Sequence, residues 1–203
     1  MTKVKICGIK SFREVEYINR AKPDFIGFVF AESRRRVDLN KAYLLKTELD
    51  PRIQTVGVFV NHDIKDIASL CDKNIIDFVQ LHGDEDRDYI RALRKYVHRP
   101  IIKAYRVKGG IREICDIIDY PLFDTYDKRQ YGGTGETFDL KYIRGINARF
   151  FLAGGLNSSN LKAAIEQSKP YCVDISSGAE TNGEKDLGKI LEIMKIARSE
   201  NHE

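Results

Sequence analysis

The chain has 203 residues, of which 42% are hydrophobic and 32% are charged, a balance typical of one globular domain covering residues 1–203. The net charge of +4 is small and the basic residues are spread along the chain, so we expect no nucleic-acid partner. No apolar run is long enough for a membrane span, the N-terminus does not resemble a signal peptide, and four scattered cysteines favour a reduced, cytoplasmic protein.

The first expected strand is residues 3–7, a β-prone stretch followed at once by Gly8. Because side chains alternate along a strand, Lys5 and Cys7 share one face and Ile6 lies on the other. A strand face that carries a lysine and a cysteine is not an ordinary core face. We therefore expect the rest of the chain to complete a site around Cys7.

Strand and helix patterns then alternate to the end of the chain. Ser11 and Glu14 form a capping box for the first helix. The further expected strands are residues 25–30, 55–60, 76–81, 100–105, 121–123, 149–153 and 170–175. The expected helices are residues 11–21, 40–49, 63–72, 85–97, 110–118, a short one that begins at 139, one that begins at 157 or 158 and reaches 167, and 185–199.

Eight strands in strict alternation with eight helices predict an α/β fold, a single-domain (β/α)8 or TIM barrel. A doubly wound open sheet also alternates, but it usually has fewer strands and a glycine-rich first turn, which residues 7–10 lack. Catalytic side chains of a barrel lie at the C-terminal ends of its strands. Those ends carry Cys7, residues 34–36, Asn61, His82, Tyr105, Asp124, Gly154, Gly155 and residues 174–178.

Cys7 is the first candidate for chemistry. A free cysteine is most often a small buried hydrophobe, and we interpret Cys71 and Cys115, both within expected helices, in that way. Cys7 differs because Lys5 shares its face, and a nearby ammonium lowers a thiol pKa. We expect Lys5 to help make Cys7 a base, and Asp174 to hold Lys5.

Asp124 and His82 are the next candidates. Asp124 ends a short apolar strand and caps no obvious helix, whereas a carboxylate beside apolar walls can keep a proton and act as a general acid. His82 has no companion at metal-ligand spacing, so we expect a structural or substrate-contacting histidine and no metal.

Two glycine- and serine-rich turns predict a phosphate site. Gly154 and Gly155 open a helix directly after a strand, and residues 176–178 follow the next strand; in barrels these two loops commonly bind phosphate. Within the polar, glycine-rich loop 125–138, residues 132–137 suggest a P-loop, but no lysine follows the last glycine, which favours a mobile lid. Residues 34–36 are three arginines, either a solvated charge run or a clamp for a carboxylate or phosphate.

The chain resembles the phosphoribosylanthranilate isomerases of tryptophan biosynthesis. The matching stretches are residues 5–9, 27–30, 33–35, 57–61, 80–83, 132–135 with 137–139, 153–157 and 174–178. The resemblance implies a cofactor-free Amadori rearrangement of N-(5-phospho-β-D-ribosyl)anthranilate to 1-(2-carboxyphenylamino)-1-deoxy-D-ribulose 5-phosphate. Glu136 stands where this family has lysine and Leu140 where it commonly has tryptophan, which bears on the lid.

The resemblance also implies roles for single residues. Cys7 would be the general base and Asp124 the general acid, and Arg35 would hold the anthranilate carboxylate, with Arg36 as the neighbouring alternative. His82 and Asp174 would contact substrate. The residues that would hold the phosphate are Gly154, Gly155, Ser176, Ser177 and Gly178.

Two other functions stay open at this point. One is the related isomerisation of a phosphoribosyl-formimino imidazole in histidine synthesis, which uses paired aspartates and is disfavoured by Cys7. The other is a non-catalytic phosphosugar-binding or thiol-redox protein, whose redox form is disfavoured because no resolving cysteine lies near Cys7. We expect a phosphosugar as the partner and a monomer, since no surplus of exposed apolar helix surface is evident.

Overall fold

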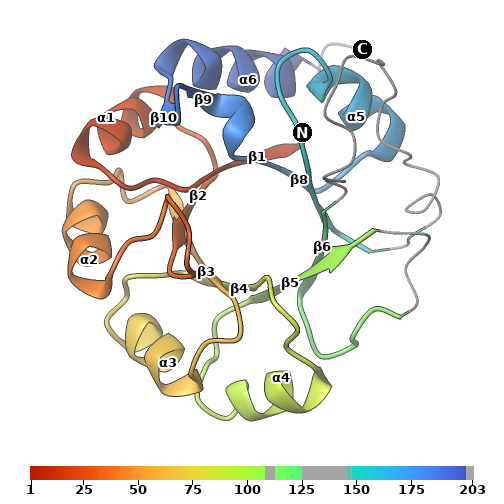
Figure 1. Cartoon of the computed structure of the whole chain (residues 1–203). Helices are drawn as coiled ribbons and strands as arrows, with labels where there is room; N and C mark the ends of the chain where they lie inside the picture. Colours follow the sequence, from red (N-terminus) through yellow and green to blue (C-terminus); the bar gives the residue numbers. More distant parts are fainter. Residues whose placement is uncertain (108–112, 125–145, 147, 200–203) are drawn as a thin grey trace.

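Eight parallel strands close into a barrel in the order β1 to β8 (Figure 1). The computed structural model describes residues 1–107, 113–124, 146 and 148–199. The barrel strands are β1 (Lys3–Cys7), β2 (Phe25–Val29), β3 (Gln54–Phe59), β4 (Phe78–Leu81), β5 (Ile101–Arg106), β6 (Tyr120–Asp124), β7 (Phe151–Ala153) and β8 (Cys172–Ile175). Strand β8 pairs with β1 and places Lys5 opposite Asp174. The predicted barrel is confirmed.

Helices surround the strands on the outside of the ring (Figure 1). The α-helices of the described residues are α1 (Phe12–Ala21), α2 (Leu39–Thr47), α3 (Ile64–Asp72), α4 (Arg87–Leu93), α5 (Leu161–Ser168) and α6 (Leu187–Ser199). The expected capping box is present: the Ser11 hydroxyl accepts from the Glu14 N–H, and the Glu14 carboxylate accepts from the Ser11 N–H. None of these helices is both long and apolar enough to cross a membrane.

The helix expected over residues 110–118 is wrong in its described part, because residues 113–118 form an irregular segment with a turn. Its backbone groups bond to side chains of neighbouring elements instead of to one another. The Cys115 N–H donates to the Tyr105 hydroxyl, and the Ile117 carbonyl accepts from Arg94. Cys115 is therefore neither helical nor fully buried, whereas Cys71 is buried within α3 as expected.

Three helix starts also differ from the expectation by two residues or more. Helix α4, expected over 85–97, begins at Arg87 because the Asp86 side chain caps it, and it ends at Leu93. Helix α5 begins at Leu161 because Asn157 and Asn160 use their side chains in a turn before it. Helix α6 begins at Leu187 because Lys185 belongs to a hairpin of two short strands, β9 (Glu180–Thr181) and β10 (Glu184–Lys185). The expected lid over residues 132–137 and the short helix from 139 lie outside the described residues.

The barrel separates two apolar layers. The outer layer packs the strands against the helices and contains Val4 and Ile6 of β1 together with Ile18 of α1. The inner layer fills the barrel and includes Phe25, whose ring centroid lies 5.3 Å from that of Phe78. The alternation predicted for β1 is confirmed, since its apolar residues face the helices. The packed interior restricts the functional site to the C-terminal end of the barrel.

Candidate active site

A cavity of about 580 Å³ lies at the C-terminal ends of the barrel strands. Its walls come from the ends of β1, β2, β3, β4, β6, β7 and β8 and from the loops that follow β2, β7 and β8. The predicted site residues that line it are Cys7, Arg35, His82, Asp124, Gly154, Gly155, Asp174, Ser176 and Ser177. Tertiary structure thus gathers nine of the ten residues around one space.

Gly178 is the predicted site residue that does not line the cavity. A Cβ atom at position 178 would lie 1.9 Å from the carbonyl oxygen of Leu156, so only glycine allows the loop after β8 to touch the loop after β7. Gly155 has a φ of +63°, in the left-handed region that favours glycine. These glycines bring together the two loops expected to bind phosphate.

Cys7 ends β1 at the cavity and is partly exposed. Burial is the largest influence on its thiol and raises the Cys7 pKa, while the Lys5 ammonium lowers it and the Asp174 carboxylate raises it. Lys5 lowers the Cys7 pKa as expected, but the net shift of the Cys7 pKa is upward. Desolvation of a thiolate in the barrel outweighs attraction to a lysine that Asp174 already holds.

Lys5 is fully buried inside the barrel. Its Nζ donates to Asp174 Oδ2 at 2.7 Å and to Gln80 Oε1 at 2.9 Å. Burial opposes the charge, but Asp174 raises the Lys5 pKa to about 12. The predicted pairing of Lys5 with Asp174 is confirmed, and within the described part of the chain the other Asp174 oxygen, Oδ1, is buried without a hydrogen-bond partner.

The polar contacts continue from Lys5 across the cavity to Asp124. The Gln80 amide nitrogen lies 2.8 Å from His82 Nδ1, and His82 Nε2 lies 3.2 Å from Asp124 Oδ2. We call Asp174, Lys5, Gln80, His82 and Asp124 the floor chain. Gln80 was missed in the sequence, although it lies two residues before His82 on the same face of β4.

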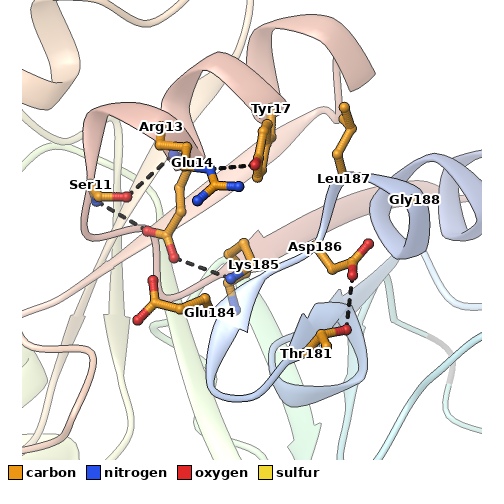
Figure 2. A pocket seen from close by; sticks show the side chains of 10 residues that line it. All are labelled: Ser11, Arg13, Glu14, Tyr17, Thr181, Glu184, Lys185, Asp186, Leu187 and Gly188. Carbon is orange, nitrogen blue, oxygen red and sulfur yellow. Dashed lines mark hydrogen bonds between the residues drawn. The ribbon is translucent and has the colours of Figure 1, made fainter.

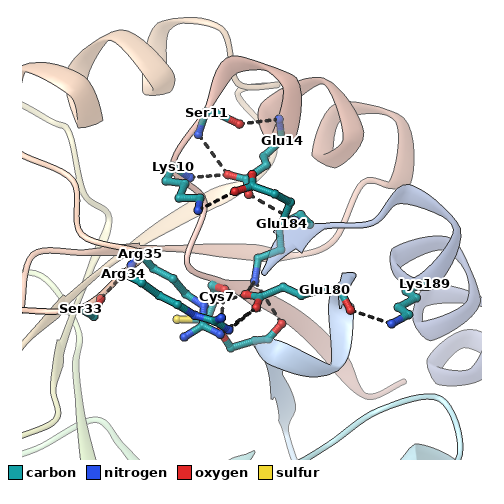
Figure 3. Close-up of polar contacts among 12 residues, drawn as sticks. Cys7, Lys10, Ser11, Glu14, Ser33, Arg34, Arg35, Glu180, Glu184 and Lys189 are labelled. Atoms are coloured by element: carbon teal, nitrogen blue, oxygen red, sulfur yellow. Dashed lines mark hydrogen bonds and ion pairs between the residues drawn. The ribbon is translucent and has the colours of Figure 1, made fainter. Parts of the chain in front are cut away.

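A second polar group, at the edge of the cavity, is built around a buried carboxylate. Glu180 accepts from Arg35 Nε at 2.6 Å, Arg35 Nη2 at 2.9 Å, Arg34 Nη2 at 2.7 Å and Lys185 Nζ at 2.7 Å. Figure 3 shows both arginines reaching from one loop to Glu180, beside Cys7. We call Glu180, Arg34, Arg35 and Lys185 the rim cluster.

The rim cluster strongly favours the ionised carboxylate. Burial opposes ionisation, but hydrogen bonds from Arg35 and Lys185 lower the Glu180 pKa to about 2, and Glu180 in turn raises the Arg35 pKa. Arg35 lines the cavity, whereas Arg36 does not and pairs with Glu32. A Cβ atom at Gly8, directly after β1, would lie 2.4 Å from Arg35 Cδ. A glycine at position 8 therefore leaves room for the Arg35 side chain.

Glu180 and Lys185 were missed because residues 180–185 were not recognised as a hairpin. Asn182 and Gly183 have φ values of +52° and +84°, and they join the two short strands as a two-residue loop. An Asn-Gly pair is a strong short-range hairpin signal. It could have been recognised in the sequence.

Two smaller cavities were also found. One has a volume of about 370 Å³ and lies between α1 and the hairpin. Figure 2 shows its lining side chains, among which Arg13 donates to the Tyr17 hydroxyl and Thr181 donates to Asp186. The other, also about 370 Å³, lies beside β5 and includes the buried pair of Lys103 and Glu85, 2.8 Å apart. Among the described residues, no group of histidine, cysteine, aspartate and glutamate has an arrangement for holding a metal ion.

Comparison with known proteins gives one consistent result. A family model described as N-(5'-phosphoribosyl)anthranilate (PRA) isomerase matches residues 4–196. An N-(5'-phosphoribosyl)anthranilate isomerase from Endomicrobium trichonymphae is 50% identical over 199 residues, covering 98% of this chain and all of the relative.

Solved structures agree. The phosphoribosyl anthranilate isomerase from Thermotoga maritima is 33% identical and superposes with a TM-score of 0.84, covering 98% of this chain and all of the other. A structure of such an isomerase in complex with reduced 1-(o-carboxyphenylamino)-1-deoxyribulose 5-phosphate is 30% identical, with a TM-score of 0.81, and covers 98% of this chain and all of the other.

Proposed function

The chain belongs to the N-(5'-phosphoribosyl)anthranilate isomerase family, and from that premise we propose that Cys7 is the general base and Asp124 the general acid of its reaction. The family makes the protein an isomerase of tryptophan biosynthesis. The residue roles rest on one observation. A thiol from β1 and a carboxylate from β6, strands that are not neighbours in the ring, line the same cavity.

The proposed reaction begins at the ring oxygen of the ribosyl group. Asp124 gives its proton to that oxygen as the bond from oxygen to C1′ breaks, and the nitrogen lone pair forms a C1′=N double bond. The Cys7 thiolate then removes the proton from C2′, and the electrons of that bond form an enolamine. Tautomerisation makes C2′ a ketone and C1′ a CH₂ group, so one carbon is oxidised while the other is reduced.

The raised Cys7 pKa has two consequences for this base. The thiolate is scarcer at neutral pH, but each thiolate is a stronger base toward a carbon-bound proton. Lys5 partly offsets the scarcity because its ammonium favours the thiolate. A buried base with a cation beside it suits the removal of a proton made acidic by the C1′=N bond.

Two anion-binding regions support the proposed substrate. The backbone of Gly154 and Gly155 and the start of the 3-10 helix η2 (Ser177–Ala179) line the cavity on one side, and we assign the phosphate to them. Arg35 lies on another side. Two of its five N–H groups are bonded to Glu180, and the remaining donors suit the anthranilate carboxylate.

The test is turnover of phosphoribosylanthranilate, generated in situ and followed by its fluorescence. We expect Cys7→Ser and Asp124→Asn each to lower kcat on the order of a hundredfold or more, because each removes a positioned base or acid. Thr55→Val, which alters a buried hydroxyl of β3 that is not part of the cavity lining, is the matched control and should keep its activity. Activity that survives Cys7→Ser would move the role of base to Asp174.

The proposal also covers the oligomeric state of the enzyme and its need for a metal or cofactor. We propose that the enzyme is a cytoplasmic monomer that needs no metal or cofactor. Sedimentation or light scattering of the purified chain measures its mass, and turnover after treatment with a chelator tests the metal. A mass of two chains, or activity lost to the chelator, would contradict these points.

A further inference from the structure

We propose that Gln80 is a positioning residue that holds His82 in its neutral form, protonated on Nε2, so that His82 donates to Asp124 Oδ2. The inference rests on the proposed function, because it assigns Asp124 as the acid. It starts from Gln80 itself, a buried amide that touches both Lys5 and His82. No part of the proposed reaction otherwise uses Gln80.

The orientation of the Gln80 amide is set by Lys5. A lysine ammonium only donates hydrogen bonds, so the amide atom 2.9 Å from Lys5 Nζ must be the carbonyl oxygen. Lys5 keeps its charge at neutral pH, since Asp174 holds it at 2.7 Å inside the barrel. The amide NH₂ group of Gln80 must therefore face His82.

The orientation of Gln80 then decides where His82 carries its proton. An NH₂ group donates and cannot accept, so the contact of 2.8 Å requires His82 Nδ1 to be an unprotonated acceptor. A neutral imidazole with an unprotonated Nδ1 carries its hydrogen on Nε2. A second proton on Nδ1 would face an N–H group of Gln80 and lose the hydrogen bond.

The consequence reaches Asp124. His82 Nε2–H faces Asp124 Oδ2 at 3.2 Å, so each link from Lys5 through Gln80 and His82 donates in the same direction. A donor at this position stabilises the carboxylate that Asp124 becomes after it has given its proton to the substrate.

The same arrangement explains why His82 is not the acid. An imidazolium would have to donate from both ring nitrogens, and Gln80 offers it no acceptor. His82 thus orients and stabilises Asp124 without competing for the proton. The charged Lys5, two contacts away from His82, enforces this arrangement.

The decisive measurement is the protonation of His82 in solution at pH 7, read from the ¹⁵N chemical shifts of its two ring nitrogens by NMR. Only four histidines are present, and His82→Asn identifies the signal. We expect a protonated Nε2 and a bare Nδ1 in the wild type. A proton on Nδ1 in the wild type would overturn the proposal, whatever the activity of any variant.

Two substitutions extend the test. Gln80→Glu offers His82 Nδ1 an acceptor, so we expect Nδ1 to gain a proton. Gln80→Met keeps the length of the side chain but removes the amide, so His82 Nδ1 loses its donor and the preference for a proton on Nε2 should weaken. We expect a fall in kcat of roughly tenfold with KM nearly unchanged, less than the loss of the acid itself would cause. An unchanged ¹⁵N spectrum in Gln80→Glu, or a fully active Gln80→Met, would contradict the assignment.

Thr55→Val serves as the control for the loss of a buried polar group on a barrel strand, because Thr55 bonds to Ile75 and Asp77 away from the cavity. It should leave the His82 spectrum and kcat unchanged. The outcomes separate the two proposals. If Asp124→Asn stays active, the assigned acid is wrong, whereas the ¹⁵N spectrum of the wild type tests the tautomer of His82 independently of the role of Asp124.

Discussion

The floor chain and the rim cluster meet at one cavity but balance their charges differently. In the floor chain, the Lys5 ammonium donates to one carboxylate, that of Asp174, and to the amide oxygen of Gln80. In the rim cluster, one carboxylate, Glu180, faces two arginines and a lysine. In the floor chain each donor has one acceptor, which fixes the positions of the protons. The rim cluster has more cations than carboxylates, which keeps positive charge where we propose that the anthranilate carboxylate binds.

Exposure differs between the two groups as well. The Lys5 side chain is 0% exposed, whereas that of Arg34 is 59% exposed. Electrostatic interactions weaken where water can reach the charges. We therefore expect substitutions in the floor chain and at the buried Glu180 to alter stability, and substitutions of the two arginines of the rim cluster to alter substrate affinity more than stability.

The largest effect should come from Lys5→Met. Removal of the ammonium leaves the Asp174 carboxylate buried without its partner, and breaking a buried ion pair from one side costs about 3–5 kcal/mol of unfolding free energy. Urea denaturation measures this loss. The double variant Lys5→Met with Asp174→Leu removes both charges and should regain much of the lost unfolding free energy. If Lys5→Met alone stays within about 1 kcal/mol of wild type, Lys5 and Asp174 are not a tightly coupled pair.

Glu180→Gln should have the next largest effect. Loss of a buried carboxylate with charged donors costs about 2–3 kcal/mol at pH 7. The folded Glu180 pKa is about 2, below its ordinary value, so the ionised form stabilises the fold above the ordinary pKa. That contribution disappears as the pH falls from about 4.3 toward 2.

Urea denaturation of wild type and Glu180→Gln at pH 7, 4.5 and 3 checks this dependence. The difference in unfolding free energy between the two proteins should be full at pH 7 and smaller at pH 3. Asp38→Asn, which alters an exposed helix cap, is the control for a general effect of acid. A difference that grows on acidification would contradict the sign.

The smallest effects should separate the two arginines of the rim cluster. Arg35 is the more buried and lines the cavity beside Cys7, so Arg35→Gln should raise KM about tenfold or more, as expected for a lost charge-assisted bond of about 1.5–3 kcal/mol. Arg34→Gln should raise KM only a few-fold, because exposed ion pairs contribute below about 1 kcal/mol. Steady-state kinetics of both variants at two salt concentrations measure these changes in KM. Equal increases in KM would mean that the anthranilate carboxylate does not bind at Arg35.

Strand periodicity in the sequence predicted more than the order of elements. It indicated that Lys5 and Cys7 face inward, and closure of an eight-strand ring places β8 beside β1, which is why the pairing of Lys5 with Asp174 was predictable. The same logic placed His82 and Asp124 at strand ends around one space. Local alternation and the barrel rule are both properties of short stretches of chain, so they can be read before the structure is known.

The irregular segment over residues 113–118 and the hairpin over 180–185 were harder to predict for different reasons. The first looks helical, but side chains from distant elements, Arg94 and Tyr105, take its backbone groups. The second carries a recognisable Asn-Gly turn, but a helical pattern that begins beside it obscured the turn. In residues 113–118, tertiary contacts override a weak preference for helix. In residues 180–185, the pattern of the following helix made the Asn-Gly turn hard to recognise.

The sequence by itself determined the barrel, the set of strand-end residues and, through its motifs, the family. Only the tertiary structure decided that burial raises the Cys7 pKa, that Glu180 holds Arg35, and that Gln80 joins Lys5 to His82. The reason is physical. Periodicity reports the direction in which a side chain points, whereas desolvation and hydrogen bonding depend on which groups from distant parts of the chain come within about 3 Å of it.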